Sequence, residues 1–252
     1  MHTARFKFKI DTLETTSDFA LDLLSCLYKN GQIVGNSWPM ALADEWLETT
    51  VTVPDAAALD LESNNRYVND SLAKAQLEGL RPPDIEIVGM DPTSHTVCAC
   101  ENLDRLVLFT TYMSEAPPLR CLACFHVVPL YRIPHIHDDE HLCILHWEAD
   151  YQACDTLQMH CTTGERFGED QLADHDSSLS RNGRDICEKL EAIMGIPIYY
   201  YLHRMKGRSL EEERGRPCPS CHQPWKLSER THLFDFKCDP CRLLSAVPSS
   251  IE

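Results

Sequence analysis

The chain has 252 residues, of which 43% are hydrophobic, so it can form one large domain or a domain joined to a small module. Its thirteen cysteines, in a chain whose first residues lack an apolar signal segment, favour a reducing compartment with thiols or bound metal over a disulfide scaffold. No run reaches the roughly 18–20 apolar residues of a membrane span, so we expect a cytoplasmic protein that stays out of the membrane.

The net charge of −16 is distributed unevenly along the chain. Residues 1–201 carry a net charge of −18, whereas residues 202–245 carry +3. Because an acidic surface repels phosphate, any nucleic-acid binding is expected in the C-terminal part alone. The same acidic body can attract a basic protein partner. The charge pattern leaves both kinds of partner open.

The body of the chain alternates between strand and helix patterns without the regularity of βαβ units. Strands are predicted at 3–10, 32–35, 46–53, 85–90, 106–112, 127–133, 142–147 and 198–202, and helices at 17–29, 65–78, 150–161 and 178–194. Period-two alternation marks the first strand, and Gly31 and Gly195 mark the ends of two helices. The order of elements predicts an α+β fold with a mixed or antiparallel sheet and helices.

Two Cys-x-x-Cys pairs near the C-terminus form the most specific pattern in the chain. Cys218 and Cys221 are separated by sixteen residues from Cys238 and Cys241. Zn²⁺ favours four soft ligands in a tetrahedron, and this spacer is long enough for a hairpin that joins the two pairs. The pattern predicts a small C-terminal zinc ribbon with zinc as its cofactor, with chance or redox pairs as the alternatives. We therefore divide the chain into an acidic α+β domain, 1–205, and a basic linker with the ribbon, 206–252.

A second set of four cysteines lies in the middle of the chain, at Cys98, Cys100, Cys121 and Cys124. On a strand, Cys98 and Cys100 would point to the same face, as a chelating edge requires. Neighbouring side chains that can replace a missing thiolate are His126, His135, His137, His141 and Cys143. The alternative is that these cysteines are small buried apolar groups. A second metal site is a hypothesis at this point.

A thiol enzyme would need a cysteine with a neighbouring base. Cys154, Asp155, His160 and Cys161 lie close together in the sequence. Cys154 and Cys161 are seven residues apart, so on a helix they share a face, as two core residues also would. We therefore expect no enzymatic activity.

Basic residues surround the first cysteine pair of the ribbon. The candidate contacts to nucleic acid or to a partner are Arg204, Lys206, Arg208, Arg214, Arg216, Lys226, Arg230 and Lys237. They are interleaved with Trp225, Phe234 and Phe236, and cations with aromatic rings are typical of proteins that bind single strands or RNA. The alternative is a small domain whose aromatic residues form its core and whose charges are solvated.

Several stretches resemble a known family. They are PLRCLACF (118–125), VPLYR (128–132), DYQACDTLQM (150–159), GERFG (164–168), SSLSR (177–181) and LFDFKC (233–238). The resemblance is to an uncharacterised bacterial family described as containing a zinc ribbon and as candidate nucleic-acid-binding proteins. It implies a zinc ribbon at Cys218, Cys221, Cys238 and Cys241.

Together these observations predict a non-enzymatic zinc-ribbon protein that contacts nucleic acid or a nucleoprotein through its C-terminal part. The second hypothesis is an acidic inhibitor or adaptor, for example an immunity protein that neutralises a basic toxin domain. The two hypotheses differ in the working surface, which is the ribbon in the first and the acidic body in the second.

Overall fold

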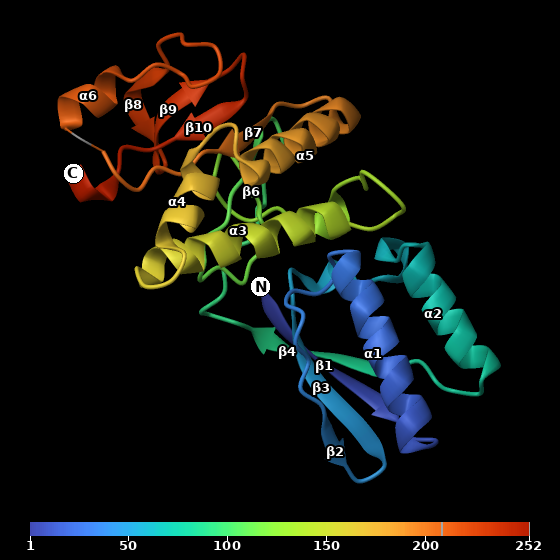
Figure 1. Cartoon of the computed structure of the whole chain (residues 1–252). Coiled ribbons are helices and arrows are strands. Elements are labelled where there is room, and N and C mark those ends of the chain that lie inside the picture. The colour runs from blue at the N-terminus through green and yellow to red at the C-terminus, as the bar shows by residue number, and fades with distance from the viewer. Residues whose placement is uncertain (208, 252) are drawn as a thin grey trace. The chain divides into compact units, whose positions relative to one another are not determined.

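The computed structural model describes residues 1–207 and 209–251, which fold into two compact units. Unit 1 comprises residues 1–99, 115–117 and 126–142, and unit 2 comprises residues 100–114, 118–125 and 143–252. Each unit has its own sheet, and Figure 1 labels the elements of both. The predicted fold class, α+β with mixed and antiparallel sheets, is confirmed. The main division falls near residue 100, and the predicted boundary between residues 205 and 206 lies within unit 2.

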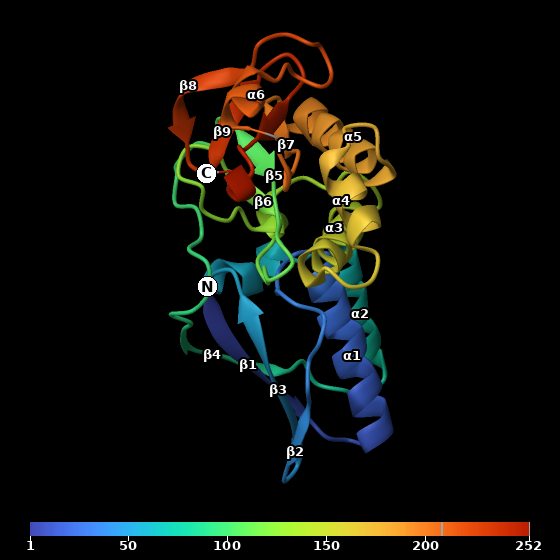
Figure 2. The same ribbon diagram turned by 60° about the vertical axis from the view of Figure 1, so that its left-hand side comes forward.

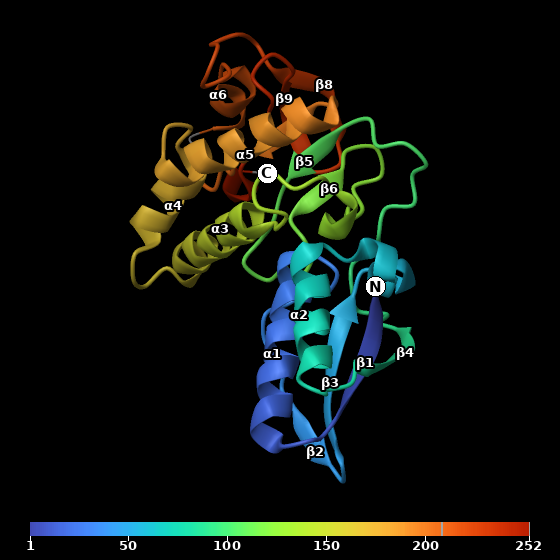
Figure 3. The same ribbon diagram turned by 90° about the vertical axis from the view of Figure 1, so that its right-hand side faces the viewer.

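Unit 1 is built on a four-stranded antiparallel sheet in the order β2-β3-β1-β4. The strands are β1 (His2–Lys9), β2 (Ala41–Ala43), β3 (Trp46–Val53) and β4 (Asp84–Met90). In β1 the apolar side chains of Ala4, Phe6 and Phe8 are buried on one face, because successive residues of a strand point to opposite sides. The helices α1 (Leu13–Lys29) and α2 (Arg66–Leu77) lie side by side on one face of the sheet (Figure 3).

Unit 2 is built on a six-stranded mixed sheet in the order β6-β5-β7-β10-β9-β8. The strands are β5 (Leu106–Leu108), β6 (Leu119–Cys121), β7 (Ile198–Tyr201), β8 (Lys226–Thr231), β9 (Phe234–Cys238) and β10 (Leu243–Ser245). β7 runs parallel to both β5 and β10, and the other neighbours are antiparallel. The sheet therefore continues from the body of the unit into the cysteine-rich end of the chain.

The helices that accompany this sheet in the described part of unit 2 are α3 (Leu142–His160), α4 (Glu165–Ala173), α5 (Ser178–Met194) and α6 (Leu210–Gly215). α5 approaches β7 closely at Gly183, where an added Cβ would lie 2.3 Å from the ring of Tyr200. The indole ring of Trp147, on α3, packs against the same tyrosine with ring centroids 6.0 Å apart. A glycine is needed here because any side chain would separate α5 from the sheet.

Some predicted strands are wrong. Residues 142–147 form the first part of α3, since a short apolar run does not distinguish a strand from a buried helix. In 127–133, Val127 makes an isolated bridge and Leu130–Arg132 is a 3₁₀ turn. In 32–35, Val34 makes a single bridge to Thr52. None of the described helices is long and apolar enough to cross a membrane.

Candidate metal centre and basic pocket

The C-terminal cysteine tetrad brings four sulfur atoms together. The Sγ atoms of Cys218, Cys221, Cys238 and Cys241 all lie within 4.8 Å of one another, and those of Cys221 and Cys238 are 3.6 Å apart. Four sulfurs bound to one zinc ion at about 2.3 Å would be separated by roughly 3.8 Å. The tetrad therefore has the dimensions and the donor atoms of a tetrahedral metal site.

Tight turns hold each pair of sulfurs in place. After Cys221 the chain takes the left-handed conformation at His222, with φ of 59°, and the His222 N–H donates to the carbonyl of Cys218 at 2.9 Å. After Cys241 the chain does the same at Arg242, with φ of 52°. The first turn precedes β8 and the second connects β9 to β10, so the two sulfur pairs come from two separate turns of the chain.

The four thiols differ in their electrostatic surroundings. Burial raises the pKa of Cys218 and of Cys238 above the usual thiol value. The pKa of Cys221 is lowered to about 7, mainly because the backbone N–H of Gln223 hydrogen-bonds to its sulfur. Metal binding requires thiolates, and one ligand of this set is already close to ionisation at neutral pH.

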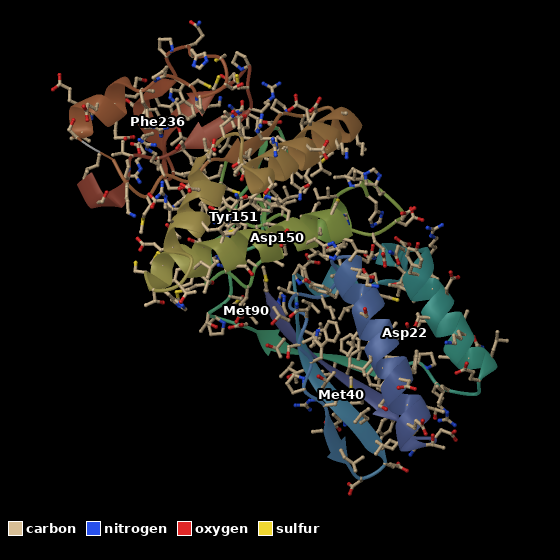
Figure 4. The ribbon with its side chains drawn as sticks, viewed as in Figure 1. Asp22, Met40, Met90, Asp150, Tyr151 and Phe236 are labelled. Atoms are coloured by element: carbon tan, nitrogen blue, oxygen red, sulfur yellow. The ribbon has the colours of Figure 1, made fainter. Side chains whose placement is uncertain are left out.

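The aromatic residues beside the tetrad belong to the core of unit 2. Trp225 and Phe236 are buried with ring centroids 5.2 Å apart, and the guanidinium of Arg216 lies 4.1 Å from the Phe236 centroid. Phe234 packs with Tyr199 and other residues of the central strands. These rings, of which Phe236 is labelled in Figure 4, are therefore not available for stacking on bases.

The second cysteine set also comes together. The sulfur atoms of Cys98, Cys100, Cys121 and Cys124 lie within 4.8 Å of one another, with Cys100 and Cys121 at 3.9 Å. The turn at Cys121–Cys124 has the geometry of the turn at Cys218, since Phe125 has φ of 62° and its N–H donates to the Cys121 carbonyl at 2.7 Å. Residues 98–100 are not in a strand, so the expected chelating edge is formed by a loop.

Two cysteine tetrads that can bind metal are thus present. Within the described residues, neither tetrad includes any of the five side chains considered as substitute ligands. His126 and His137 are exposed, and burial raises the pKa of Cys143. The rings of His135 and His141 pack at an angle of 34° with centroids 4.3 Å apart, and burial lowers the pKa of His141 to about 3.

The cysteines considered for catalysis lie on or after α3. Burial raises the pKa of Cys154, which disfavours the thiolate that a nucleophile needs. Asp155 accepts hydrogen bonds from the backbone N–H of Tyr112 at 2.7 Å and from the Gln158 side chain at 2.8 Å, so it has a structural role. His160 and Cys161 are exposed at the end of the helix.

Four of the eight basic residues predicted as contacts form ion pairs inside unit 2. Arg204 and Arg216 both pair with the buried carboxylate of Glu213, with Nε–Oε2 distances of 3.0 and 3.1 Å. Lys206 pairs with Glu169 at 2.7 Å, and Lys237 pairs with Asp239 at 2.8 Å. These cations are occupied by acidic neighbours. Arg208 lies outside the described residues.

The remaining three basic residues line one pocket. The pocket has a volume of about 340 Å³ and is bounded by Leu210, Arg214, Lys226, Leu227, Ser228, Arg230, Asp235 and Val247. It joins α6 to β8, which lie at the same end of unit 2 (Figure 2). The single acid, Asp235, accepts the Val247 N–H at 2.8 Å. Among the described residues, Arg214 and Lys226 have no carboxylate partner, so the pocket is positively charged.

Two titratable residues in the interior of unit 2, Arg120 and Glu148, were not indicated by any sequence pattern. Arg120 is buried on β6 with its guanidinium over the rings of Phe109 and Phe125, and its Nε has no hydrogen-bond partner among the described residues. Glu148, on α3, has its pKa raised to about 8 by burial, and Thr110 donates to it at 3.4 Å. Arg120 lies in the motif 118–125, but no pattern in the sequence indicated that its charge is buried.

The fold and these sites define a class, an α+β protein with two potential metal centres made of cysteine. Three family models match the chain, each described as a domain of unknown function: DUF8589 over residues 1–89, DUF2310 over 100–203 and DUF8594 over 207–250. An uncharacterized protein of Haemophilus influenzae is 33% identical over 258 residues, which is 97% of this chain and 97% of that protein. A second uncharacterized protein of the same organism is 38% identical over 165 residues, 64% of this chain and 79% of its own length.

The chain therefore belongs to the family of these Haemophilus influenzae proteins. The predicted resemblance to an uncharacterised bacterial family is confirmed, while none of the matching descriptions names a zinc ribbon. No solved structure matches the chain.

Proposed function

We propose that this protein is a non-enzymatic, cytoplasmic zinc protein that binds nucleic acid or a nucleoprotein through the pocket between α6 and β8. The observation that carries the proposal is that Arg214 and Lys226, which have no carboxylate partner among the described residues, line one pocket together with Arg230. Arg204, Lys206, Arg216 and Lys237 are instead paired with carboxylates.

Zinc fits the C-terminal tetrad because the donor set consists of four thiolates. Soft sulfur ligands select zinc over magnesium or calcium, and a closed set of four leaves no open position for catalysis. The ion would hold the turn at Cys218, before β8, against the turn that starts at Cys238 and connects β9 to its neighbour β10. The role supported here is structural.

The second tetrad supports a second zinc ion on the same grounds. Cys98, Cys100, Cys121 and Cys124 offer the same four donors, and the turn at Cys121 repeats the backbone geometry of the ribbon turn. Two zinc ions for each chain are the expected content of the reduced protein.

The residues that line the pocket are better suited to binding the phosphate groups of a nucleic acid than to binding its bases. Its lining includes the apolar side chains of Leu210, Leu227 and Val247, and none of its lining residues is aromatic. Cations that converge on an open pocket attract a phosphate backbone, and that attraction weakens steeply with salt. We therefore expect binding with little preference for sequence.

The test compares Arg214→Ala/Lys226→Ala with the control Lys74→Ala/Arg81→Ala, which removes two exposed cations from unit 1 and changes the net charge equally. Binding to fluorescently labelled RNA and DNA is measured by anisotropy between 50 and about 200 mM salt. The pocket variant should reduce the slope of log affinity against log salt by about 2, since each phosphate contact contributes about 1. Equal slopes for the two variants would contradict the proposal.

The alternative, an acidic inhibitor or adaptor such as an immunity protein, is supported by the net charge of −18 on residues 1–201. An affinity purification divided into nuclease-treated and untreated halves separates the two functions. Loss of the bound material after nuclease treatment supports nucleic-acid binding. One protein that stays bound at near-equal stoichiometry supports the inhibitor.

A further inference from the structure

The outermost strand of the unit 1 sheet is open to solvent. β4 is the last strand in the order β2-β3-β1-β4, so along its outer side no further strand is paired among the described residues. All seven of its residues are exposed, including Met90, which is labelled in Figure 4. A strand edge of this length presents a row of backbone donors and acceptors that another strand can pair with.

The side chains of β4 make this edge partly apolar. Ile85 lies opposite Phe6 and Ile87 lies opposite Ala4, so both isoleucines point to the face that carries the buried core. Phe6 and Ala4 are fully buried, yet Ile85 and Ile87 are 44% and 38% exposed. The apolar face of the unit 1 sheet therefore continues onto β4, where its side chains are exposed to solvent.

The inner neighbour of β4 shows which kind of strand matches it. β1 alternates apolar and basic residues, with Phe6 beside Ile85 on one face and Arg5 paired to Glu86 at 3.6 Å on the other. An outer neighbour with the same alternation would cover the two isoleucines and place cations beside Asp84 and Glu86. Such matched cross-strand pairs stabilise a sheet.

The charge of unit 1 distinguishes between two kinds of strand that could pair with β4, namely a second copy of this protein and a basic segment of another protein. Residues 1–99 hold 7 Lys and Arg against 15 Asp and Glu, a net charge of −8. A second copy of unit 1 would bring two such acidic surfaces together and would add the acids of its own β4. A basic segment would be attracted by the same field.

We propose that β4 binds an extended segment of a partner protein, in which apolar and basic residues alternate, as an added fifth strand of the sheet. Main-chain hydrogen bonds would supply affinity, and the isoleucine and carboxylate rows would supply selectivity.

The probe is a synthetic peptide with the sequence of residues 2–9, HTARFKFK, which is the strand that β4 already accepts on its inner side. Its control is the same peptide with Arg and Lys replaced by Glu. Binding to the full chain is measured by anisotropy, and hydrogen exchange reports on the amides of 84–90. We expect saturable binding of the basic peptide alone, weakened by salt, with new protection confined to β4.

The matched variants are Ile85→Thr/Ile87→Thr, which keeps strand-forming residues, and Leu61→Thr, an exposed leucine outside the sheet. The first should weaken peptide binding about tenfold, and the second should leave it unchanged. Binding that is equal in both variants, or that leaves β4 unprotected, overturns the proposal. So does a dimer in sedimentation velocity that Ile85→Thr/Ile87→Thr dissociates, because the occupant would then be a second copy.

Discussion

The four cysteines of the C-terminal tetrad differ in burial, with Cys218 and Cys238 inside and Cys221 and Cys241 nearer to the surface. Cys218→Ser removes a buried ligand and leaves three thiolates, which hold zinc far less tightly. We expect the loss of one metal ion per chain and a decrease of about 3 kcal/mol or more in the free energy of unfolding, because metal binding is coupled to folding. Atomic emission spectroscopy and urea unfolding measure the two effects.

The control for this substitution is Cys161→Ser, which changes an exposed cysteine outside both tetrads. It should keep the metal content and the unfolding midpoint of the parent. A Cys218→Ser protein with unchanged metal content and midpoint would show that the tetrad is not a metal site.

Glu148 makes the stability of unit 2 depend on pH. Burial raises the pKa of this carboxyl from an ordinary value of 4.5 to about 8. Below pH 4.5 the group is neutral in the folded and unfolded chains, and its burial is tolerated. Between pH 4.5 and 8 the unfolded chain ionises while the folded chain does not, so the free energy of unfolding decreases as the pH rises.

Glu148→Gln removes this titration and keeps an acceptor for the hydroxyl of Thr110. We expect the variant to match the parent near pH 4.5 and to be more stable by about 2–4 kcal/mol at pH 8. Urea unfolding at pH 4.5, 6 and 8 measures the difference, with the exposed Glu62→Gln as control. A difference that stays constant across this range would be inconsistent with a neutral Glu148.

At the scale of single residues, the sequence predicted the candidate metal ligands, but it did not predict which basic residues form ion pairs. The tetrads follow from spacing, because a Cys-x-x-Cys turn places its two sulfurs locally. The partners of Lys206 are Glu165 and Glu169, which are 41 and 37 residues away, and only the packing of α4 beside the segment after β7 brings them together. No local pattern distinguishes such a lysine from a free one.

Among the elements, α6 depends on one buried carboxylate. Glu213 is 3% exposed and pairs with Arg204 and Arg216, which lie on the two sides of the helix in the sequence. Glu213→Gln keeps the shape of the side chain but leaves the partly buried Arg216 without its counter-charge. Breaking one partner of a buried pair is destabilising, by about 2–4 kcal/mol.

We expect this change to loosen α6 before the rest of unit 2. Hydrogen exchange of residues 210–215 should accelerate, and proteases should cut the segment 204–216 more readily. The matched control is Glu212→Gln on the exposed side of the same helix. Equal exchange rates in the two variants would show that the buried pair does not hold α6.

The predicted elements agree with the structure where the pattern is long or well capped. The helix predicted from residue 17 begins at Leu13, because the Thr12 side chain accepts the Thr15 N–H and caps it earlier than Ser17. The short apolar run 142–147 predicts a strand, but it forms the first part of one helix of 19 residues, α3, which continues through residues 150–160.

At the scale of the molecule, composition favoured a body of 205 residues and a separate ribbon. The structure instead has two sheets, and the second includes strands from both sides of residue 205. The pairing that joins them is parallel, with Leu243 opposite Tyr200. Parallel neighbours need a long connection and leave no hairpin signal in the sequence, so this contact was not predictable from local patterns.

The pairing of β7 with β10 also sets an order of events on the ribosome. Strands β5 and β7 and the helices between them emerge first, but the free side of β7 gains its neighbour only after residues 243–245 have left the exit tunnel. Until then, a strand of one isoleucine and three tyrosines remains open to other nascent chains, as unpaired edges are. The time that passes before β10 pairs with β7 would therefore set how long each new chain stays vulnerable to aggregation.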